Sequence, residues 1–155
     1  MNRKLVDLLV TVAASGAILS SQIALAAPPN ACSLLSPAEI ASIVAVPMGD
    51  GVALSSATTS NCTWLQQGVD ASKAVTVIVS TKAVAAYEMG KNVMHPTAVS
   101  GIGDEAYLTG KSASYTALSV KKGQNALDVM VRGLKDVAAI QNAERALGKA
   151  AAAKL

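Results

Sequence analysis

The clearest pattern in the sequence is the alternation of apolar and polar side chains over residues 74–80, where Val75, Val77 and Val79 all face one way. Alternation with a period of two residues is typical of a half-buried strand. Other segments predict further strands at residues 62–66, 105–108, 115–121 and 126–132. The links at residues 109–111 and 122–124 are short and turn-like, which predicts that the last three strands form an antiparallel meander.

Helical patterns surround these strands. Ser36, Pro37 and Glu39 supply an N-cap, a first-turn proline and the acidic residue of a capping box, so a helix should begin at Pro37 and end near Val46. Residues 82–89 predict a second helix that ends at Gly90, followed by a loop over residues 91–100.

The alanine-rich segment 134–152 predicts a third helix, whose last residues should fray. Glu144 falls inside its apolar stripe, and three outcomes stay open: it reaches solvent, finds a partner, or marks an exposed part of that face. The element order is α-β-β-α-β-β-β-α. It predicts an α+β domain with packed helices on an antiparallel sheet of about five strands.

Residues 1–26 have the three-part organisation of a secretory signal peptide. Arg3 and Lys4 start it, a mostly apolar run covers residues 8–23, and Ala24-Leu25-Ala26 suits signal peptidase. The run is too polar in its second half for a good membrane span. We therefore expect cleavage, a single domain over residues 27–155 and no stable membrane span after it. The absence of a twin arginine favours the general secretion route to a periplasmic or secreted location.

Cys32 and Cys62 are the only cysteines, and both follow the expected signal peptide. In an oxidising compartment we expect them to form one disulfide bond, worth about 3–4 kcal/mol in the chain-entropy description. A reactive thiol pair fits less well, because the spacing suits neither a C-x-x-C motif nor a zinc site.

The charge of the chain does not indicate a nucleic-acid partner. The formal net charge is +3, from 13 basic and 10 acidic residues, and no basic stretch is interleaved with aromatic residues. The chain has no phenylalanine, one tryptophan and three tyrosines. Its core must therefore be built mainly from aliphatic side chains, which bury less area per residue, so a disulfide would add useful stability.

The segment from Gly101 to Ala106 superficially resembles a dinucleotide-binding fingerprint. That site needs a strand before the glycines and a helix after them, and neither is predicted here. We interpret the segment as a tight turn, in which Gly101 and Gly103 supply unusual backbone angles and Asp104 or Glu105 binds nearby amides. A role in ligand binding remains the alternative.

His95 is the only histidine, and the chain has no G-x-S-x-G motif, so we expect no catalytic residues. Met89, Met94 and His95 form a soft-ligand group that suits copper(I), but it is a thin set of ligands. We expect neither a metal site nor a cofactor. An enzyme or metal carrier that uses His95 with Asp104 or Met94 is the weakest hypothesis.

Four motifs occur in a defined order along the chain: Cys32-Ser33-Leu34-Leu35-Ser36-Pro37-Ala38-Glu39, Cys62-Thr63-Trp64, Gly101-Ile102-Gly103-Asp104-Glu105-Ala106-Tyr107 and Leu118-Ser119-Val120-Lys121-Lys122-Gly123. Together they resemble a group of uncharacterised exported bacterial domains, many of them actinobacterial cell-envelope lipoproteins. They are also similar to the extracellular sensor domains of some bacterial kinases. The resemblance spans nearly all of the chain after residue 26.

This resemblance implies an α+β domain with a disulfide between Cys32 and Cys62. No catalytic residues are established for the group, so none is carried over. The chain departs from the lipoproteins because Pro29-Asn30-Ala31, and not a lipobox, precedes Cys32.

These observations favour a non-catalytic extracytoplasmic binding or sensor-like module. Its partner would be a small ligand or an envelope protein, bound in an apolar groove between sheet and helix or at the loop 91–103. The candidate contact residues in this loop and directly after it are His95, Gly101, Gly103, Asp104 and Glu105. The alternative is a structural or assembly protein of the cell envelope that acts through protein contacts.

Overall fold

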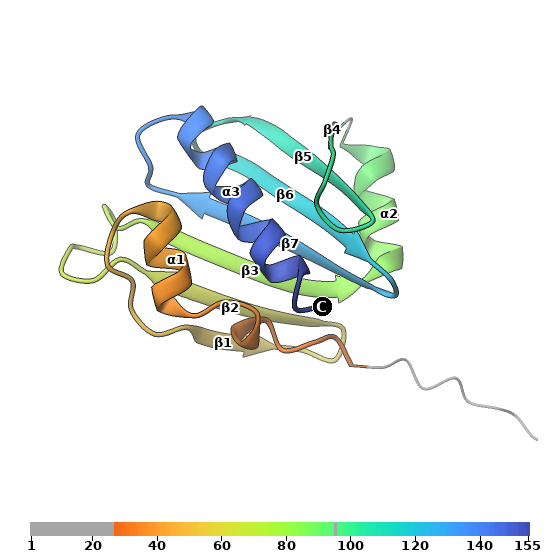
Figure 1. Ribbon diagram of the computed structural model, residues 1–155, viewed down its shortest axis with the longest axis horizontal. Coiled ribbons are helices and arrows are strands. Elements are labelled where there is room, and N and C mark those ends of the chain that lie inside the picture. The colour runs from red at the N-terminus through yellow and green to blue at the C-terminus, as the bar shows by residue number, and fades with distance from the viewer. Residues whose placement is uncertain (1–26, 95) are drawn as a thin grey trace, which may run out of the picture.

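The centre of the structure is one antiparallel sheet. The computed structural model describes residues 27–94 and 96–155, and within these residues the sheet has seven strands in the order β1-β2-β3-β7-β6-β5-β4 (Figure 1). The strands are β1 (Val52–Ser55), β2 (Thr59–Leu65), β3 (Thr76–Ala83), β4 (Thr97–Val99), β5 (Glu105–Ser112), β6 (Tyr115–Lys122) and β7 (Asn125–Arg132).

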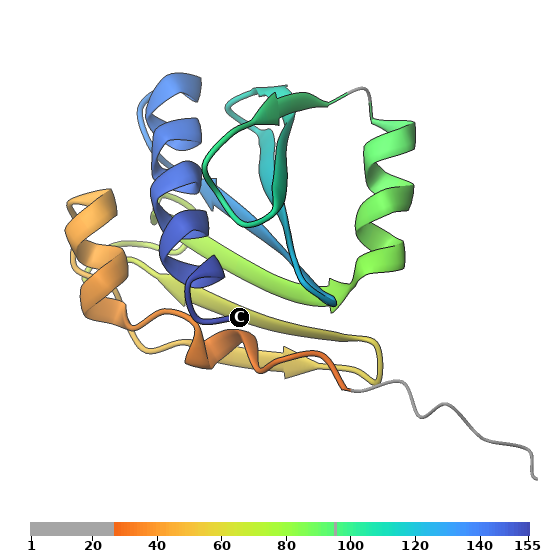
Figure 2. The same cartoon turned by 45° about the vertical axis from the view of Figure 1, so that its right-hand side comes forward.

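Helices cover both faces of this sheet. A short 3-10 helix, η1 (Ala31–Ser33), precedes α1 (Pro37–Val44), while α2 (Val84–Val93) follows β3 and α3 (Val137–Ala152) ends the chain. Figure 2 shows α1 and α3 together on one face and α2 on the opposite face. None of the helices in the described part of the chain is long and apolar enough to cross a membrane.

The main hydrophobic core lies between the sheet and the layer that holds η1, α1 and α3. In β7, Leu127, Val129 and Val131 point into this core. Gly148 lets α3 approach the sheet closely, since a Cβ atom there would clash with the side chain of Leu118. A smaller cluster of Tyr87, Tyr107 and Ala126 joins α2 to the other face.

The start of α1 forms as its sequence predicts. The Glu39 amide donates to Ser36 Oγ at 3.2 Å, and the Ser36 amide donates to the Glu39 carboxylate at 2.8 Å, which completes the capping box. The helix ends at Val44 because Ala45 adopts a left-handed backbone conformation with φ 59°. Glu39 also binds Lys154 at 2.7 Å, and this ion pair, with the Ser36 hydrogen bonds, lowers the pKa of Glu39 to about 2.

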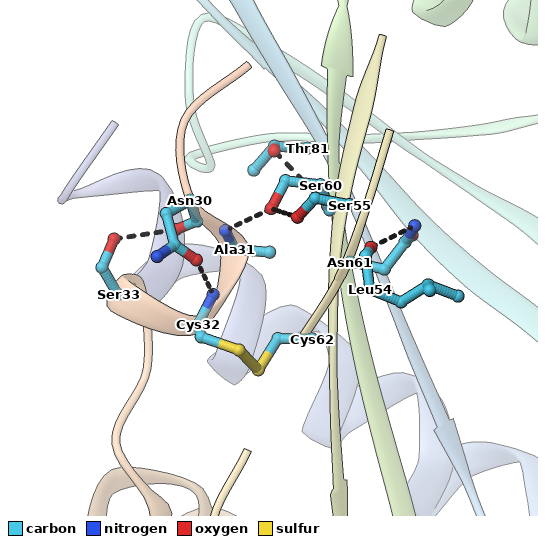
Figure 3. Close-up of a disulfide and its surroundings, with 10 residues drawn as sticks. All are labelled: Asn30, Ala31, Cys32, Ser33, Leu54, Ser55, Ser60, Asn61, Cys62 and Thr81. Carbon is cyan, nitrogen blue, oxygen red and sulfur yellow. Dashed lines mark hydrogen bonds between the residues drawn. A yellow bond between two sulfur atoms is a disulfide. The ribbon is translucent and has the colours of Figure 1, made fainter. Parts of the chain in front are cut away.

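The predicted disulfide between Cys32 and Cys62 is confirmed, and it joins η1 to β2 (Figure 3). A hydrogen bond from the Ala31 amide to Ser60 Oγ, at 3.1 Å, crosses the same junction, and Asn30 Oδ1 caps η1 by accepting from the Cys32 amide at 2.9 Å. Gly51 lies against the bond, because a Cβ atom there would be 2.6 Å from Cys62 Sγ. The amino-terminal segment is therefore fastened to the sheet covalently and by hydrogen bonds.

The α+β class is confirmed, but the prediction of about five strands and their order is wrong. Two strands were not predicted. All four residues of β1 are exposed, so its sequence carries no alternation of buried and exposed positions. The strand β4 has only three residues and pairs with β5 alone.

Some predicted helix limits are also wrong. The second helix continues past Gly90 to Val93, because this glycine lies against the Tyr107 hydroxyl: a Cβ atom there would be 2.8 Å from that oxygen. The third helix begins after Asp136, whose side chain caps it, and it does not fray at Gly148, because Ala151 and Ala152 are buried in the core. The predicted signal peptide, residues 1–26, lies outside the described residues.

Candidate functional site

Polar side chains occupy the middle of the sheet on the face that α2 partly covers. Ser80 on β3, Ser119 on β6 and Asp128 on β7 all lie on this face. The pairing register explains why they meet, since Asp128 lies opposite Ser80 on one side and opposite Ser119 on the other. Lys82 is two residues beyond Ser80 on the same face of β3, and its side chain extends to Asp128.

These residues form the polar part of a cavity of about 210 Å³, the α2 pocket, between α2 and the sheet. Lys82 Nζ lies 2.5 Å from Asp128 Oδ2, and Ser119 Oγ donates to Asp128 Oδ1 at 2.5 Å. The Lys82 and Asp128 side chains are only 15% and 30% exposed. A charged pair that is this well shielded interacts more strongly than one on the open surface.

Apolar side chains make up much of the remaining wall of the α2 pocket. Ile78 and Met130 lie on the sheet, whereas Met94 and Tyr115 lie at the opening and are 42% and 45% exposed. Large hydrophobic side chains that remain this exposed beside a cavity are typical of contact surfaces. The pocket therefore combines a shielded ion pair and a hydroxyl with an adaptable apolar wall.

An ion-pair network holds α2 in place above the sheet. Lys121 Nζ lies 2.6 Å from Glu88 on α2 and 3.0 Å from Glu105 on β5, and Glu105 also pairs with Lys91 on α2. Hydrogen bonds from Lys91 and then Lys121 lower the pKa of Glu105, and those to Glu88 and Glu105 raise the pKa of Lys121.

Two tyrosines, whose rings pack at an angle of 44°, hold the same helix against the sheet. The Tyr107 hydroxyl donates to the Tyr87 carbonyl at 3.1 Å, and the ring centroids lie 4.8 Å apart. Burial raises the pKa of both phenols, so they remain neutral at physiological pH. Gly90 and Tyr107 line the α2 pocket, so the network and the tyrosines hold in place the helix that forms one side of it.

The predicted contact residues of the loop 101–105 do not line this pocket. Gly101 and Gly103 have φ values of 77° and 60°, and a Cβ atom on Gly103 would lie 2.5 Å from the Lys121 carbonyl oxygen. Asp104 Oδ2 accepts from the Gly123 amide at 2.7 Å, whereas Glu105 forms the ion pairs described above. These contacts support the interpretation of a tight turn in which Asp104 binds a nearby amide.

The structure describes two of the three residues that were considered as copper(I) ligands, Met89 and Met94. Met94 lines the α2 pocket, Met89 is exposed on α2, and His95 lies outside the described residues. Among the residues that the structure describes, no three His, Cys, Asp or Glu side chains gather in a way that could hold a metal ion.

A second hollow, of about 760 Å³, lies between α1 and α3. Much of its lining is apolar, and it includes three polar side chains: Gln66, Lys135 and Asn142. Gln66 Oε1 accepts from the Val75 amide at 3.1 Å, and Lys135 Nζ lies in solvent 3.9 Å from Asp136. Gln66 is therefore engaged with the backbone and Lys135 with solvent, whereas the charged side chains of the α2 pocket are paired inside it.

Lys82, Ser119 and Asp128 were not predicted from the sequence as site residues. The sequence does contain one signal. Asp128 is an acidic residue among the apolar residues of a predicted strand, and it becomes enclosed when that strand pairs with a neighbour on each side. That signal is usable only once the strand order is known.

Comparison of the chain with known proteins finds no matching family, no matching curated protein and no matching solved structure. The function is therefore inferred from the geometry of the site and from the sequence.

Proposed function

We propose that this protein is an exported, non-catalytic binding or sensor-like module that holds a small molecule in the α2 pocket. The observation that carries the proposal is the convergence of Lys82, Asp128 and Ser119 inside a cavity with apolar walls. Ligand sites typically combine an apolar lining with a few convergent polar groups that orient the ligand.

The polar groups are better arranged for binding than for catalysis. A serine nucleophile needs a base that accepts its proton, and that base is usually oriented by a third group. Ser119 does donate to Asp128, but that carboxylate is also the counter-ion of Lys82 and is not the base of a serine–base pair oriented by a third group. The three side chains are therefore suited to form hydrogen bonds with a ligand.

The size of the α2 pocket limits the ligand. A volume of about 210 Å³ corresponds to roughly seven water molecules at ~30 Å³ each, and it is smaller than the ~300–1,000 Å³ of sites for drug-sized ligands. A compact ligand with one polar end and one apolar end fits these dimensions and this lining.

Export is part of the same proposal. The disulfide suits an oxidising compartment such as the periplasm or the extracellular medium. The signal-like segment at residues 1–26 supplies the route, and its cleavage would leave the described domain.

The proposal predicts that protein recovered from outside the cytoplasm of its own host carries extra mass in native mass spectrometry. Ala117 lines the α2 pocket and Ala146 lines the hollow between α1 and α3, so Ala117→Leu and Ala146→Leu form a matched pair of space-filling variants. We expect Ala117→Leu to lose the extra mass and Ala146→Leu to keep it. Thermal unfolding of both variants checks that they fold.

Each other outcome argues against this site. Loss of the mass in Ala146→Leu alone would place the ligand between α1 and α3. Retention of the mass in both folded variants, or no small-molecule mass in the wild type, would contradict ligand binding in the α2 pocket.

A second candidate function, assembly through protein contacts, is favoured by the edge strand β1. Val52 and Leu54 on this strand are 69% and 74% exposed, the strand carries no charge, and its outer edge has no strand partner among the described residues. Such an edge can accept an extended segment of a partner protein by β-strand addition. In the same mass measurement, a protein-sized increment instead of a small one would favour this function.

A further inference from the structure

We infer that the ligand of the α2 pocket is a zwitterion, a free α-amino acid with an apolar side chain, whose carboxylate pairs with Lys82 and whose ammonium pairs with Asp128. This inference rests on the proposed function and names the ligand class for the same site.

The charge balance of the α2 pocket carries the inference. Among the described residues that line the pocket, Lys82 and Asp128 are the only charged ones, and their charges balance. A ligand with one charge would bring an unbalanced charge into this shielded and neutral site. An unbalanced charge in a shielded position is unfavourable, whereas a zwitterion adds one charge of each sign and can pair with both side chains at once.

The two side chains have unused hydrogen-bonding capacity. An ammonium group has three donors, and among the described residues Lys82 uses one of them, on Asp128. A carboxylate offers about four lone-pair sites, and Asp128 uses one for Lys82 and one for Ser119. The ion pair can therefore remain intact while the ligand's carboxylate and ammonium group add to it side by side.

The rest of the lining selects an apolar side chain on the amino acid. Ile78, Met94 and Met130 line the pocket with Tyr115, and none of these side chains carries a charge. Methionine side chains are flexible and polarizable, so they adapt to ligands of slightly different shape. A branched aliphatic amino acid such as leucine is the probe that matches this wall.

The test is a calorimetric titration of the purified full-length chain with L-leucine and with two analogues, each of which lacks one charge. 4-Methylpentanoate keeps the carboxylate, and 3-methylbutylamine keeps the ammonium. We expect leucine to bind, and we expect the affinity of each analogue to be lower by roughly tenfold or more, because each analogue loses charge-assisted hydrogen bonds. Lys82→Met and Asp128→Asn should each weaken leucine binding to a similar degree, and Ala146→Leu should leave it unchanged.

The outcomes separate this inference from the proposed function. Either analogue binding as tightly as leucine would overturn the zwitterion and leave the pocket as the site. Absence of leucine binding, while protein from the host still carries a mass that Ala117→Leu removes, would also overturn the inference but not the proposed function. If leucine does not bind and protein from the host carries no such mass, both the inference and the proposed function are overturned.

Discussion

Replacing Cys32 and Cys62 together with alanine is expected to lower the free energy of unfolding by ~3–4 kcal/mol. The bond connects residues separated by 30 positions, so its loss frees a long loop in the unfolded chain. Single domains are stable by only ~5–15 kcal/mol, which makes this a large share of the total. Urea denaturation of the wild type and the double variant measures the difference.

The buried position of the disulfide leads to a second expected result, for the reduced protein. Cys62 is fully buried beside Trp64 on β2, and Gly51 lies against both. Reduction of the wild type should reproduce the destabilisation, and the same reductant should leave the double variant unchanged. A double variant as stable as the oxidised wild type would contradict this expectation and would show that noncovalent contacts such as the hydrogen bond from Ala31 to Ser60 suffice to hold η1 on the sheet.

Glu144 is expected to make the stability of the fold depend on pH. Its side chain is completely buried between α3 and the sheet, where Oε1 accepts from Thr116 Oγ1 at 2.8 Å and from the Val131 amide at 3.2 Å. Within the described residues Oε2 has no hydrogen-bond partner. Burial raises the pKa of this carboxyl from its ordinary value of 4.5 to about 7.

The sign of the effect follows from the raised pKa. The folded protein holds the Glu144 proton more tightly than the unfolded chain, so the associated stability is complete below pH 4.5. It is lost as the pH rises from 4.5 towards about 7, because the folded state must then bury a charge or bind a proton that the unfolded state has released. At ~1.4 kcal/mol per pKa unit, the loss is ~3 kcal/mol.

Glu144→Gln removes this titration. The stability of the variant relative to the wild type should increase by ~3 kcal/mol between pH 4.5 and pH 8, whatever the fixed cost of placing an amide there. Denaturant unfolding at several pH values measures the two curves. Asp50→Asn, at an exposed turn position, is the matched carboxyl-to-amide control and should run parallel to the wild type. Parallel curves for Glu144→Gln and the wild type would contradict the buried, protonated carboxyl.

Local features of the fold were predictable from the sequence where the physical cause is local. The capping box of Ser36 and Glu39 depends on residues three positions apart, and it forms as expected. The alternating β3 and β7 strands bury every second residue in one core, and they were also predicted. By contrast, β1 is stabilised by its pairing with β2, and all of its residues are exposed, so no periodic pattern marks it.

The candidate site was not predictable for a related reason. Lys82, Ser119 and Asp128 are separated in sequence and come together only because β7 lies between β3 and β6. That strand order places the last strand of the chain in the middle of the sheet, which a sequence pattern does not specify. In the loop that the sequence did single out, 101–105, Gly103 allows a close approach to Lys121, Gly101 has a positive φ, and Asp104 binds the amide of Gly123.

The central claim is that a small molecule occupies the α2 pocket. A high-resolution crystal structure of the chain, purified without added ligand from outside the cytoplasm of its host, tests it most directly. We predict ordered non-water density in contact with Lys82 Nζ and the Asp128 carboxylate, with its apolar part against Met94 and Met130. A pocket filled only by water, in a sample whose native mass shows a bound molecule, would contradict the claim.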